Sequence, residues 1–433
     1  MKNHRGFAGK ILEVDLSDGS INKYELDTND VKDYIGGKGY GAKLLWDKTE
    51  KDFDPLGENN PIIFATGPLT GTCFPTSGRM CIVSKSPLTN TYCDSHVGGH
   101  FGPEMKFAGY DFLVLTGRSP DPVYLSIKDN KVEIKDASDL WGKDVFKTEK
   151  EIKDAMNRRP RVASIGPAGE NLVKYASISI DLYRHAGRGG LGAVMGSKNL
   201  KAVAVEGTGS LQVYDRERFD ELSKESSEAI DKDLDLQSRR RWGTGNSVLW
   251  SSENSLYPTR NYQSTTFKGA ANLSGLKMER EVWVKDRACF GCPIHCAHLA
   301  YVKNTPYRGT VVEGIEYEVT SMLGSNCDVK NLNAVTHSNM LCDKLGLDAL
   351  STGSTIAWAM ECFENGILNT EATDGIDLEF GNHEAMNETD LVTFLPKVSK
   401  LLQRDWTWGK NSPCTLREWN CPHGEFEPHR QWG

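Results

Sequence analysis

The chain has 433 residues, of which 38% are hydrophobic and 25% charged, so it is long enough for about two to four globular domains. Its net charge of -8 disfavours nucleic acid as a partner, and no apolar run is long enough to predict a membrane span. Eleven cysteines without an apolar leader predict a cytoplasmic protein whose cysteines are thiols and metal ligands.

The first segment, residues 1–209, is rich in glycine and in short β-type runs. Residues 11–16 and 21–26 alternate in polarity around the turn sequence at 17–20, which predicts a β-hairpin. Further runs that favour strands lie at 62–65, 81–84, 112–116, 123–127, 162–165 and 202–205. The expected fold class is α+β, with a sheet-rich N-terminal domain.

The second segment, residues 210–386, changes to helical periodicity. Residues 216–236 are charged with a helical spacing, and residues 350–368 form a clear helical pattern that Gly366 is expected to end. The predicted cap of the second helix is Ser351 or Thr352. Its predicted apolar face is Ile356, Met360 and Phe363.

The last segment, residues 387–433, is atypical because its apolar periodicity weakens. Four of the ten tryptophans lie between Trp406 and Trp432, beside prolines and histidines. One hypothesis is a shifted reading frame, which the nucleotide sequence around codon 400 would test.

Three cysteines lie within eight residues in the order C-x2-C-x3-C, at Cys289, Cys292 and Cys296. Such a group plus one distant thiolate is a common way to hold a 4Fe-4S cluster, and Gly291 and Pro293 let the backbone curl around it. A zinc site remains an alternative, whereas a radical enzyme that uses S-adenosylmethionine would have the reverse spacing.

Glycine-rich patches recur in the first segment, two of them beside an arginine. Glycine lets backbone N–H groups approach an anion closely and arginine clamps phosphate, so together they predict a phosphate-bearing cofactor. Tight turns and sheet bulges are the structural alternative for any one patch. No dinucleotide fingerprint is present. The patches are 36–41, Gly78-Arg79, Gly98-Gly99 and 187–192.

Two acidic groups in the second segment are candidates for function. The stretch 343–348 carries Asp343 and Asp348 around a glycine turn and is able to accept N–H groups of a heterocycle; the alternative is a helix end followed by a capped helix. Glu313, Glu316 and Glu318 follow the cysteines, and a carboxylate in a closed pocket serves as a general acid or base. At least two of these three are expected at a solvated strand edge.

Together these patches resemble the tungsten-containing aldehyde:ferredoxin oxidoreductases over about residues 5–385. The motifs that carry the resemblance include Ala65-Thr-Gly-Pro-Leu-Thr-Gly71, Ser77-Gly-Arg79, Phe101-Gly-Pro-Glu104, Ile165-Gly-Pro-Ala-Gly-Glu170, Ala186-Gly-Arg-Gly-Gly-Leu-Gly192, the cysteine group and Glu316-Tyr-Glu318. The resemblance implies a sheet-rich base that seats a tungsten, or molybdenum, bis-pyranopterin centre, followed by helical domains.

The resemblance also implies roles for individual residues. Glu316 and Glu318 would lie near the metal, and the three cysteines would hold a 4Fe-4S cluster. The residues expected to bind the pterin and its phosphates are Arg79, His96, Gly98, Gly99, Arg188, Gly189, Gly190, Gly192, Asp343, Gly346, Leu347 and Asp348. The implied reaction oxidises an aldehyde with water to a carboxylic acid and passes electrons to ferredoxin, in an enzyme that is commonly a homodimer.

Departures from the family pattern matter as well. The family's second helical domain, with its fourth cluster ligand, is expected to be missing, and His96 stands where asparagine is usual. We therefore expect the isolated chain to be inactive or nearly so. The alternatives are a non-catalytic remnant, a relative such as the tungsten subunit of an aryl-CoA reductase, and an iron–sulfur electron-transfer module.

Overall fold

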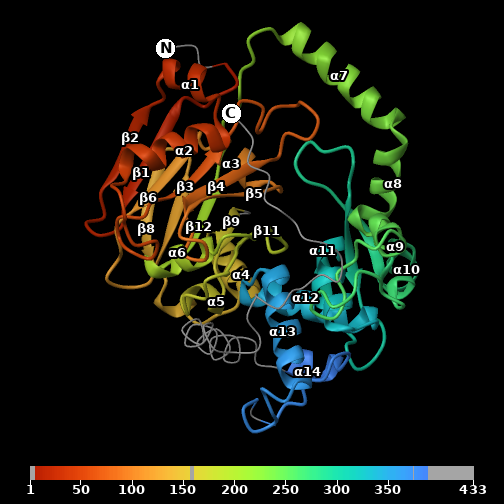
Figure 1. Ribbon diagram of the computed structural model, residues 1–433. Coiled ribbons are helices and arrows are strands. Elements are labelled where there is room, and N and C mark those ends of the chain that lie inside the picture. Colours follow the sequence, from red (N-terminus) through yellow and green to blue (C-terminus); the bar gives the residue numbers. More distant parts are fainter. Residues whose placement is uncertain (1–4, 157–159, 374, 389–433) are drawn as a thin grey trace, which may run out of the picture.

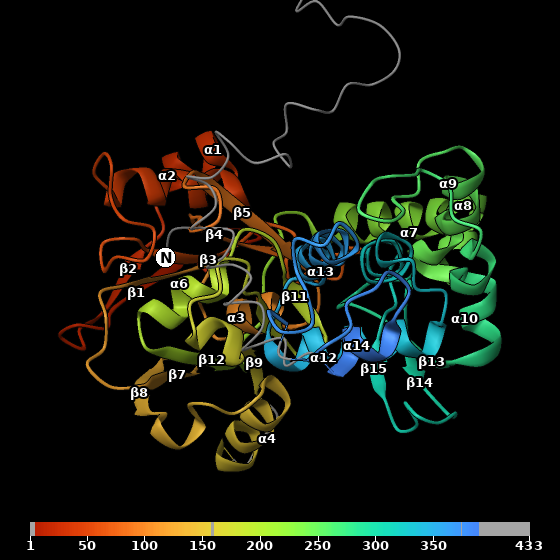
Figure 2. The same cartoon turned by 60° about the horizontal axis from the view of Figure 1, so that its bottom comes forward.

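The computed structural model describes residues 5–156, 160–373 and 375–388. A sheet-rich part is followed by a part built mainly of helices, and the two lie side by side in Figures 1 and 2. The expected α+β class is confirmed. The tail predicted from residue 387 lies, apart from its first two residues, outside the described ranges. None of the helices described combines the length and apolar character that crossing a bilayer requires.

The first sheet has six strands in the order β2-β1-β6-β3-β4-β5. The predicted hairpin is confirmed, because β1 and β2 pair antiparallel with Val14 opposite Ile21. Side chains alternate along the strands. Leu12, Ile62 and Phe64 face one core, while Ile11 and Ile63 face another. The strands are β1 Lys10–Asp15, β2 Ile21–Glu25, β3 Ile62–Thr66, β4 Met80–Lys85, β5 Tyr92–Val97 and β6 Phe112–Thr116.

The second sheet also has six strands, in the order β11-β10-β9-β12-β7-β8. Its residues Leu125 and Val203 share one core with the first sheet, so the two sheets pack face to face. The central strands β9 and β12 are buried almost throughout, which explains their continuous apolar runs. The strands are β7 Val123–Lys128, β8 Lys131–Asp136, β9 Arg161–Ser164, β10 Ile178–Ile180, β11 Arg184–Ala186 and β12 Leu200–Glu206.

Helices cover and join the two sheets. Helix α2 packs Leu44 and Leu45 on the outer face of the first sheet, and α4 packs Ile152 on the outer face of the second. Helices α3 and α6 contribute to the core between the sheets. The helices are α1 Thr28–Tyr34, α2 Gly37–Lys48, α3 Phe101–Phe107, a 3-10 turn Ser138–Leu140, α4 Val145–Met156, α5 Pro167–Glu170 and α6 Leu191–Ser197.

The second part surrounds α12 and α13 and contains a small third sheet, β13-β14-β15, that was not predicted. Its α-helices are α7 Arg216–Lys232, α8 Leu234–Trp242, α9 Ser247–Glu253, α10 Gly275–Glu281, α11 Tyr317–Val319, α12 Leu332–Leu345, α13 Ala349–Glu364 and α14 His383–Glu388. Short turns cover Gly243–Asn246, Ala270–Leu273, Thr320–Gly324 and Ser325–Cys327, and the strands are β13 Trp283–Arg287, β14 Ala297–Tyr301 and β15 Val311–Glu313.

Two helix predictions need correction. The helix expected over 216–236 is broken at Asp233, whose side chain accepts from the Leu236 N–H and starts a new helix, α8. The cap of α13 is Asp348 rather than Ser351 or Thr352. Of the apolar face predicted for α13, Ile356 and Met360 are buried, and Phe363 packs against the same core.

Candidate functional site

A cavity of about 540 Å³ lies where the sheet-rich part meets α12 and α13. Its walls come from segments that are far apart in the sequence. Strand β5, the region around β11, the turn after β15 and the turn between α12 and α13 all contribute side chains. Such a concave site at a junction between parts of a protein is the usual form of a cofactor or substrate site.

Most of the residues expected to bind the pterin, and both glutamates expected near the metal, line this cavity. Those that do are Arg79, His96, Gly98, Arg188, Glu316, Glu318, Asp343, Leu347 and Asp348. Five others lie outside the lining, namely Gly99, Gly189, Gly190, Gly192 and Gly346. Close backbone packing explains Gly190, Gly192 and Gly346, where an added Cβ would lie under 3.0 Å from a backbone atom, whereas Gly189 faces the Cys93 thiol. At Gly190, for example, φ is +75° and a Cβ would overlap the carbonyl oxygen of Lys174.

The turn between α12 and α13 carries both acids of the 343–348 motif. Gly346 ends α12 in the left-handed conformation, and Asp348 caps α13 by accepting from the Leu350 N–H. Asp348 Oδ2 also lies 3.0 Å from Arg188 Nη1, which ties this turn to the glycine-rich loop of the sheet-rich part. The structural alternative for this motif is therefore correct, and it places both acids in the cavity wall.

Asp343 is held by a histidine that was not predicted. His185 Nε2 lies 3.0 Å from Asp343 Oδ1, and His185 Nδ1 lies 3.1 Å from Ser179 Oγ. Burial raises the pKa of the Asp343 carboxyl, while His185 partly offsets that rise. The second oxygen, Oδ2, is buried without a hydrogen-bond partner among the described residues, which costs roughly 1–3 kcal/mol.

The three glutamates occupy different environments, so the expectation that at least two lie at a solvated edge is wrong. Glu313 is buried and pairs with Arg184 and, at 3.1 Å, with Arg287. Glu316 accepts from the Thr244 hydroxyl, and only Glu318 is exposed. Burial raises the pKa of the Glu316 carboxyl, an effect that the Thr244 hydrogen bond reduces.

The three cysteines occupy the loop between β13 and β14. The Phe290 N–H donates to the Gly99 carbonyl at 3.1 Å, so the loop lies against the end of β5. Burial, then the nearby Glu316 carboxylate, raises the pKa of the Cys296 thiol. In the part of the chain that the structure covers, no three His, Cys, Asp or Glu side chains converge as metal ligands. The three thiols thus share one loop, but in these described residues they do not converge on a common point as metal ligands do.

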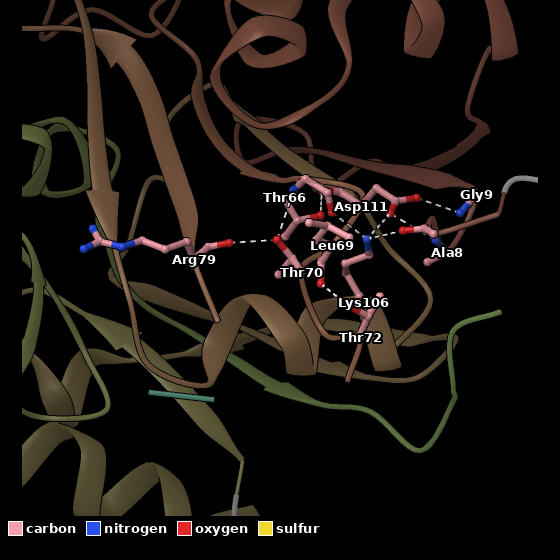
Figure 3. Close-up of polar contacts among 11 residues, drawn as sticks. Ala8, Gly9, Thr66, Leu69, Thr70, Thr72, Arg79, Lys106 and Asp111 are labelled. Carbon is pink, nitrogen blue, oxygen red and sulfur yellow. Dashed lines mark hydrogen bonds and ion pairs between the residues drawn. The ribbon is translucent and has the colours of Figure 1, made fainter. Parts of the chain in front are cut away.

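Two residues that line the cavity, Arg79 and His96, lie directly before β4 and on β5. The Arg79 carbonyl accepts from Thr70 Oγ1 at 2.7 Å, and Figure 3 shows its guanidinium pointing away from that contact. That guanidinium makes no hydrogen bond or ion pair with another described residue, so it is available to an anion. His96, in the position where asparagine was expected, lies 2.8 Å from Asp94.

Comparison with known proteins identifies the relatives of this chain. Residues 11–207 match the family model of the aldehyde ferredoxin oxidoreductase N-terminal domain, and residues 221–390 match that of aldehyde ferredoxin oxidoreductase domains 2 and 3. The chain belongs to the aldehyde ferredoxin oxidoreductase family. The two matched regions correspond to the sheet-rich part and the helical part described above.

Individual relatives support this family. A tungsten-containing aldehyde ferredoxin oxidoreductase of Pyrococcus horikoshii is 42% identical over 387 residues, which are 88% of this chain and 63% of the relative. The WOR-like subunit of an aliphatic sulfonate oxidoreductase of Pyrococcus furiosus is 36% identical over 399 residues, 88% of this chain and 63% of that one. The chain therefore spans less than two thirds of the length of these relatives.

A solved structure is also similar. The active-site complex BamBC of benzoyl coenzyme A reductase, in complex with 1,5-dienoyl-CoA, aligns with a TM-score of 0.76 and 30% identity. The alignment covers 93% of this chain and 61% of that one. The fold is thus shared by proteins that are named for different substrates.

The cavity residues fit a pterin cofactor of the kind that this family implies. The unpartnered Asp343 Oδ2 requires a donor, and pterin N–H groups are donors. The Arg79 and Arg188 guanidinium groups beside the same cavity suit phosphate. For an iron–sulfur cluster the donor chemistry fits, since three thiols share one loop, and Gly98 leaves room for Cys289 Sγ, which would lie 2.6 Å from an added Cβ.

Arg184, His185 and Asn339 line the cavity and were missed in the sequence, as was Thr244, which donates to the cavity residue Glu316. Arg184 and His185 directly precede the 186–192 motif and lie on the same short strand, β11. Their position next to that motif could have marked them as candidate site residues. Thr244 carried none, because its role depends on the distant Glu316.

Proposed function

We propose that this chain holds the cofactors of an oxidoreductase that converts an aldehyde and water to a carboxylic acid and passes the electrons to ferredoxin. The cofactors are a tungsten (or molybdenum) bis-pyranopterin and a 4Fe-4S cluster. The observation that carries this proposal is the cavity of about 540 Å³, which gathers Arg79, Arg188, Asp343, Asp348 and Glu316 from separate segments of a family member. When bound, the metal centre supplies the two-electron redox chemistry.

The residues of the chain would bind and orient the cofactor. Asp343 accepts N–H groups of a pterin ring through Oδ2, which has no other partner among the described residues. Arg79 and Arg188 bind phosphate groups, and Asp348 holds the Arg188 guanidinium in place from the α13 cap. Gly98, which has no side chain, leaves space in the cavity wall for the Cys289 thiol.

Glu316 would hold and move a proton beside the substrate. Its Oε2 accepts from Thr244, which leaves Oε1 for water or the aldehyde. Because burial raises the pKa of this carboxyl, it exchanges a proton nearer to neutral pH than an exposed glutamate does. Glu318 lines the cavity from a more exposed position and would stay at its entrance.

The cysteine loop would form the exit for electrons. Cys289, Cys292 and Cys296 would provide three thiolate ligands for the cluster, next to the largely buried Arg184 guanidinium. Although burial lowers the pKa of Arg184, Cys289 and Glu313 raise it above its ordinary value, so the positive charge beside the thiolates persists. We further propose a homodimer and a cytoplasmic location, where thiols such as those of Cys81, Cys327 and Cys342 persist.

A second candidate is the tungsten subunit of an aryl-CoA reductase. The observation that favours it is the similarity to BamBC of benzoyl coenzyme A reductase over 93% of this chain. The same pterin and cluster contacts would serve there, and the difference would lie in the substrate and the electron partner.

Metal and pterin content, together with dye reduction, would test the proposal. The full chain is produced in a host that makes the bis-pterin cofactor, and we expect about one tungsten, two pterins and up to about four irons per chain after gel filtration. Reduction of a viologen dye with acetaldehyde would support the aldehyde reaction, whereas oxidation of a dienoyl-CoA instead would favour the second candidate. Iron without pterin would overturn both in favour of an electron-transfer module.

The same assay tests the expectation that the isolated chain has little activity. Turnover of acetaldehyde at a rate comparable to that of a full-length relative, with all cofactors retained, would contradict that expectation. Cofactor retention without turnover would confirm it and would leave the proposed binding site intact.

A further inference from the structure

Three polar side chains, Ser179, His185 and Asp343, form a row from the sheet-rich part to the helical part beside the cavity. His185 on β11 stands directly opposite Ser179 on β10. Its Nδ1 lies 3.1 Å from Ser179 Oγ, and its Nε2 lies 3.0 Å from Asp343 Oδ1 on α12. Ser179 and Asp343 are buried, and His185 is largely buried.

The hydrogen positions in this row of side chains follow from the negative charge of the Asp343 carboxylate. A neutral imidazole whose Nε2 faces a carboxylate carries its hydrogen on that nitrogen, because a lone pair would be repelled there. Nδ1 then accepts, and the Ser179 hydroxyl donates to it. Ser179 therefore fixes which nitrogen of His185 faces Asp343.

At the Asp343 end of this row of side chains, two polar atoms have no hydrogen-bond partner among the described residues. Nε2 of His185 is at ion-pair distance from Asp343 Oδ1, yet it is not aligned for a hydrogen bond. Oδ2 of Asp343 is buried with no hydrogen-bond partner among the described residues. His185 and Asp343 both line the cavity, so donors brought by a bound molecule are the available way to satisfy this carboxylate.

The surroundings of Asp343 make the contribution of His185 necessary. Burial and the nearby Glu313 both raise the pKa of the Asp343 carboxyl, and the groups that oppose them come from His185 alone. Asn339, one turn earlier on α12, donates to the Gly314 carbonyl and is not directed at Asp343.

We propose that His185 is a positioning residue that holds Asp343 Oδ1, so that Oδ2 remains directed to N–H donors of the heterocycle bound in the cavity. The inference rests on the proposed function and deepens it, since it adds a residue to the recognition of the pterin. The heterocycle must offer adjacent N–H groups, as a pyrimidine-type amide and amine edge does.

Pterin retained per chain tests this role without any measurement of turnover. The full chain and its variants are produced in a host that makes the cofactor, and pterin is released, oxidised and quantified by fluorescence after gel filtration. We expect His185→Ala to retain about tenfold less pterin than the wild type, the effect of losing one charge-assisted contact. His185→Gln, whose amide is able to donate to Oδ1, should restore retention to within about threefold.

Two further variants distinguish positioning from a merely structural role. In an Asp343→Asn background, His185→Ala should cause no additional loss of pterin, because the charge that it serves is absent. His337→Ala is the matched control: it removes a histidine that is hydrogen-bonded to Thr310, at 2.8 Å, on the same helix but outside the cavity lining, and it should retain pterin as the wild type does.

Each outcome decides something. Equal pterin in the wild type and His185→Ala, additive losses in the double variant, or a fall in the apo melting temperature of His185→Ala that His185→Gln does not reverse would overturn the inference while the proposed function stands. A wild-type chain that retains no pterin would overturn the proposed function, and this inference with it.

Discussion

Three buried lysines show how single side chains connect distant segments. Their ammonium groups donate to backbone carbonyl oxygens instead of reaching solvent. The pairs are Lys106 with Gly6 and Gly67, Lys198 with Glu58 and Gly117, and Lys201 with Lys143. Lys106 also lies 3.5 Å from Asp111, which accepts from the Ala8 and Gly9 N–H groups, and Figure 3 shows this cluster. Loss of one such lysine would remove one or two of these hydrogen bonds to backbone carbonyls.

Lys198 predicts a dependence of stability on pH. Burial lowers the pKa of its ammonium group to about 8, whereas the same group in the unfolded chain titrates near about 10.4. The cost of burying the charge is fully present below about pH 8 and is relieved as pH rises above it, because the unfolded state then binds more protons. Urea unfolding of the wild type and Lys198→Met at pH 7, 8 and 9 should show the wild type gaining about 1 kcal/mol relative to the variant. A constant difference would contradict this.

Lys106 predicts a large effect of removing one member of a buried ion pair. Lys106→Met leaves the Asp111 carboxylate buried without its partner, so the free energy of unfolding should fall by about 3 kcal/mol. Lys106→Met with Asp111→Asn should recover part of that loss, since no uncompensated charge remains. Denaturant unfolding measures both, with the exposed Lys131→Met expected to stay within about 0.5 kcal/mol of the wild type. A single variant as stable as the control would refute the role of the pair.

At the scale of elements, the end of β5 and the loop between β13 and β14 form one unit. The Phe290 N–H reaches the Gly99 carbonyl, and the Thr76 N–H donates to the Gly291 carbonyl at 2.8 Å. The cysteine loop is therefore positioned by the turns at Thr76 and Gly99, which lie far earlier in the sequence. Any side chain at Gly98 would occupy the space of Cys289.

Gly98→Ala tests this contact. Its Cβ would lie 2.6 Å from Cys289 Sγ, so the loop must shift and iron per chain should fall several-fold while the circular dichroism spectrum stays unchanged. Gly67→Ala is the control, because its added methyl group would meet nothing closer than 3.9 Å. Iron content is measured after reconstitution with iron and sulfide. Normal iron in Gly98→Ala would argue against a cluster at this loop.

The sequence predicts the strands of the two large sheets well because they alternate or are continuously apolar between turn residues. It does not predict β13, whose residues from Val284 to Arg287 are exposed and carry no apolar pattern. The break at Asp233 and the cap at Asp348 were missed for a related reason: an aspartate inside a helical pattern is either a solvated residue or a cap, and only the backbone decides which.

For the candidate site, glycine-rich and acidic motifs gave the right segments but not the contacts. Arg188 and Asp348 meet because the α12–α13 turn docks on the 187–192 loop, which no local pattern encodes. Thr244 is a single residue without a spacing, so only its packing against Glu316 reveals it. His185 adjoins the 186–192 motif, but its contact with Asp343 is visible only in the structure. Sequence motifs therefore show which segments form the site, whereas the contacts between individual side chains depend on tertiary packing.

At the scale of the whole molecule, separate hydrophobic cores meet near the cavity. One lies between the two sheets, and another joins α12 and α13 with Ala168, Val173 and Tyr175 of the sheet-rich part. Helix α7 differs from both: it has no buried residue and, in Figure 1, it runs along the outside of the molecule. The stability of the fold is thus unevenly distributed.

This uneven distribution predicts the pattern of amide hydrogen exchange. Exchange in α7, Arg216–Lys232, should be at least about 100-fold faster than in α12 and α13, because few buried contacts oppose its local opening. Exchange measured by mass spectrometry on peptides from the three helices provides the comparison. Protection of α7 equal to that of α12 would show that an exposed helix is held by contacts which its burial does not reveal.

The spread of the cavity lining from Arg79 to Leu350 also bears on biogenesis. A nascent chain that has folded only its two sheets presents one wall of the site, and the opposing wall is not synthesised until the ribosome passes α12 and the start of α13. Under the proposed function, the cofactor would therefore enter only after α12 and the start of α13 have been made. A factor that delivers it would have to recognise a chain whose two walls are both present and still open enough to admit the cofactor.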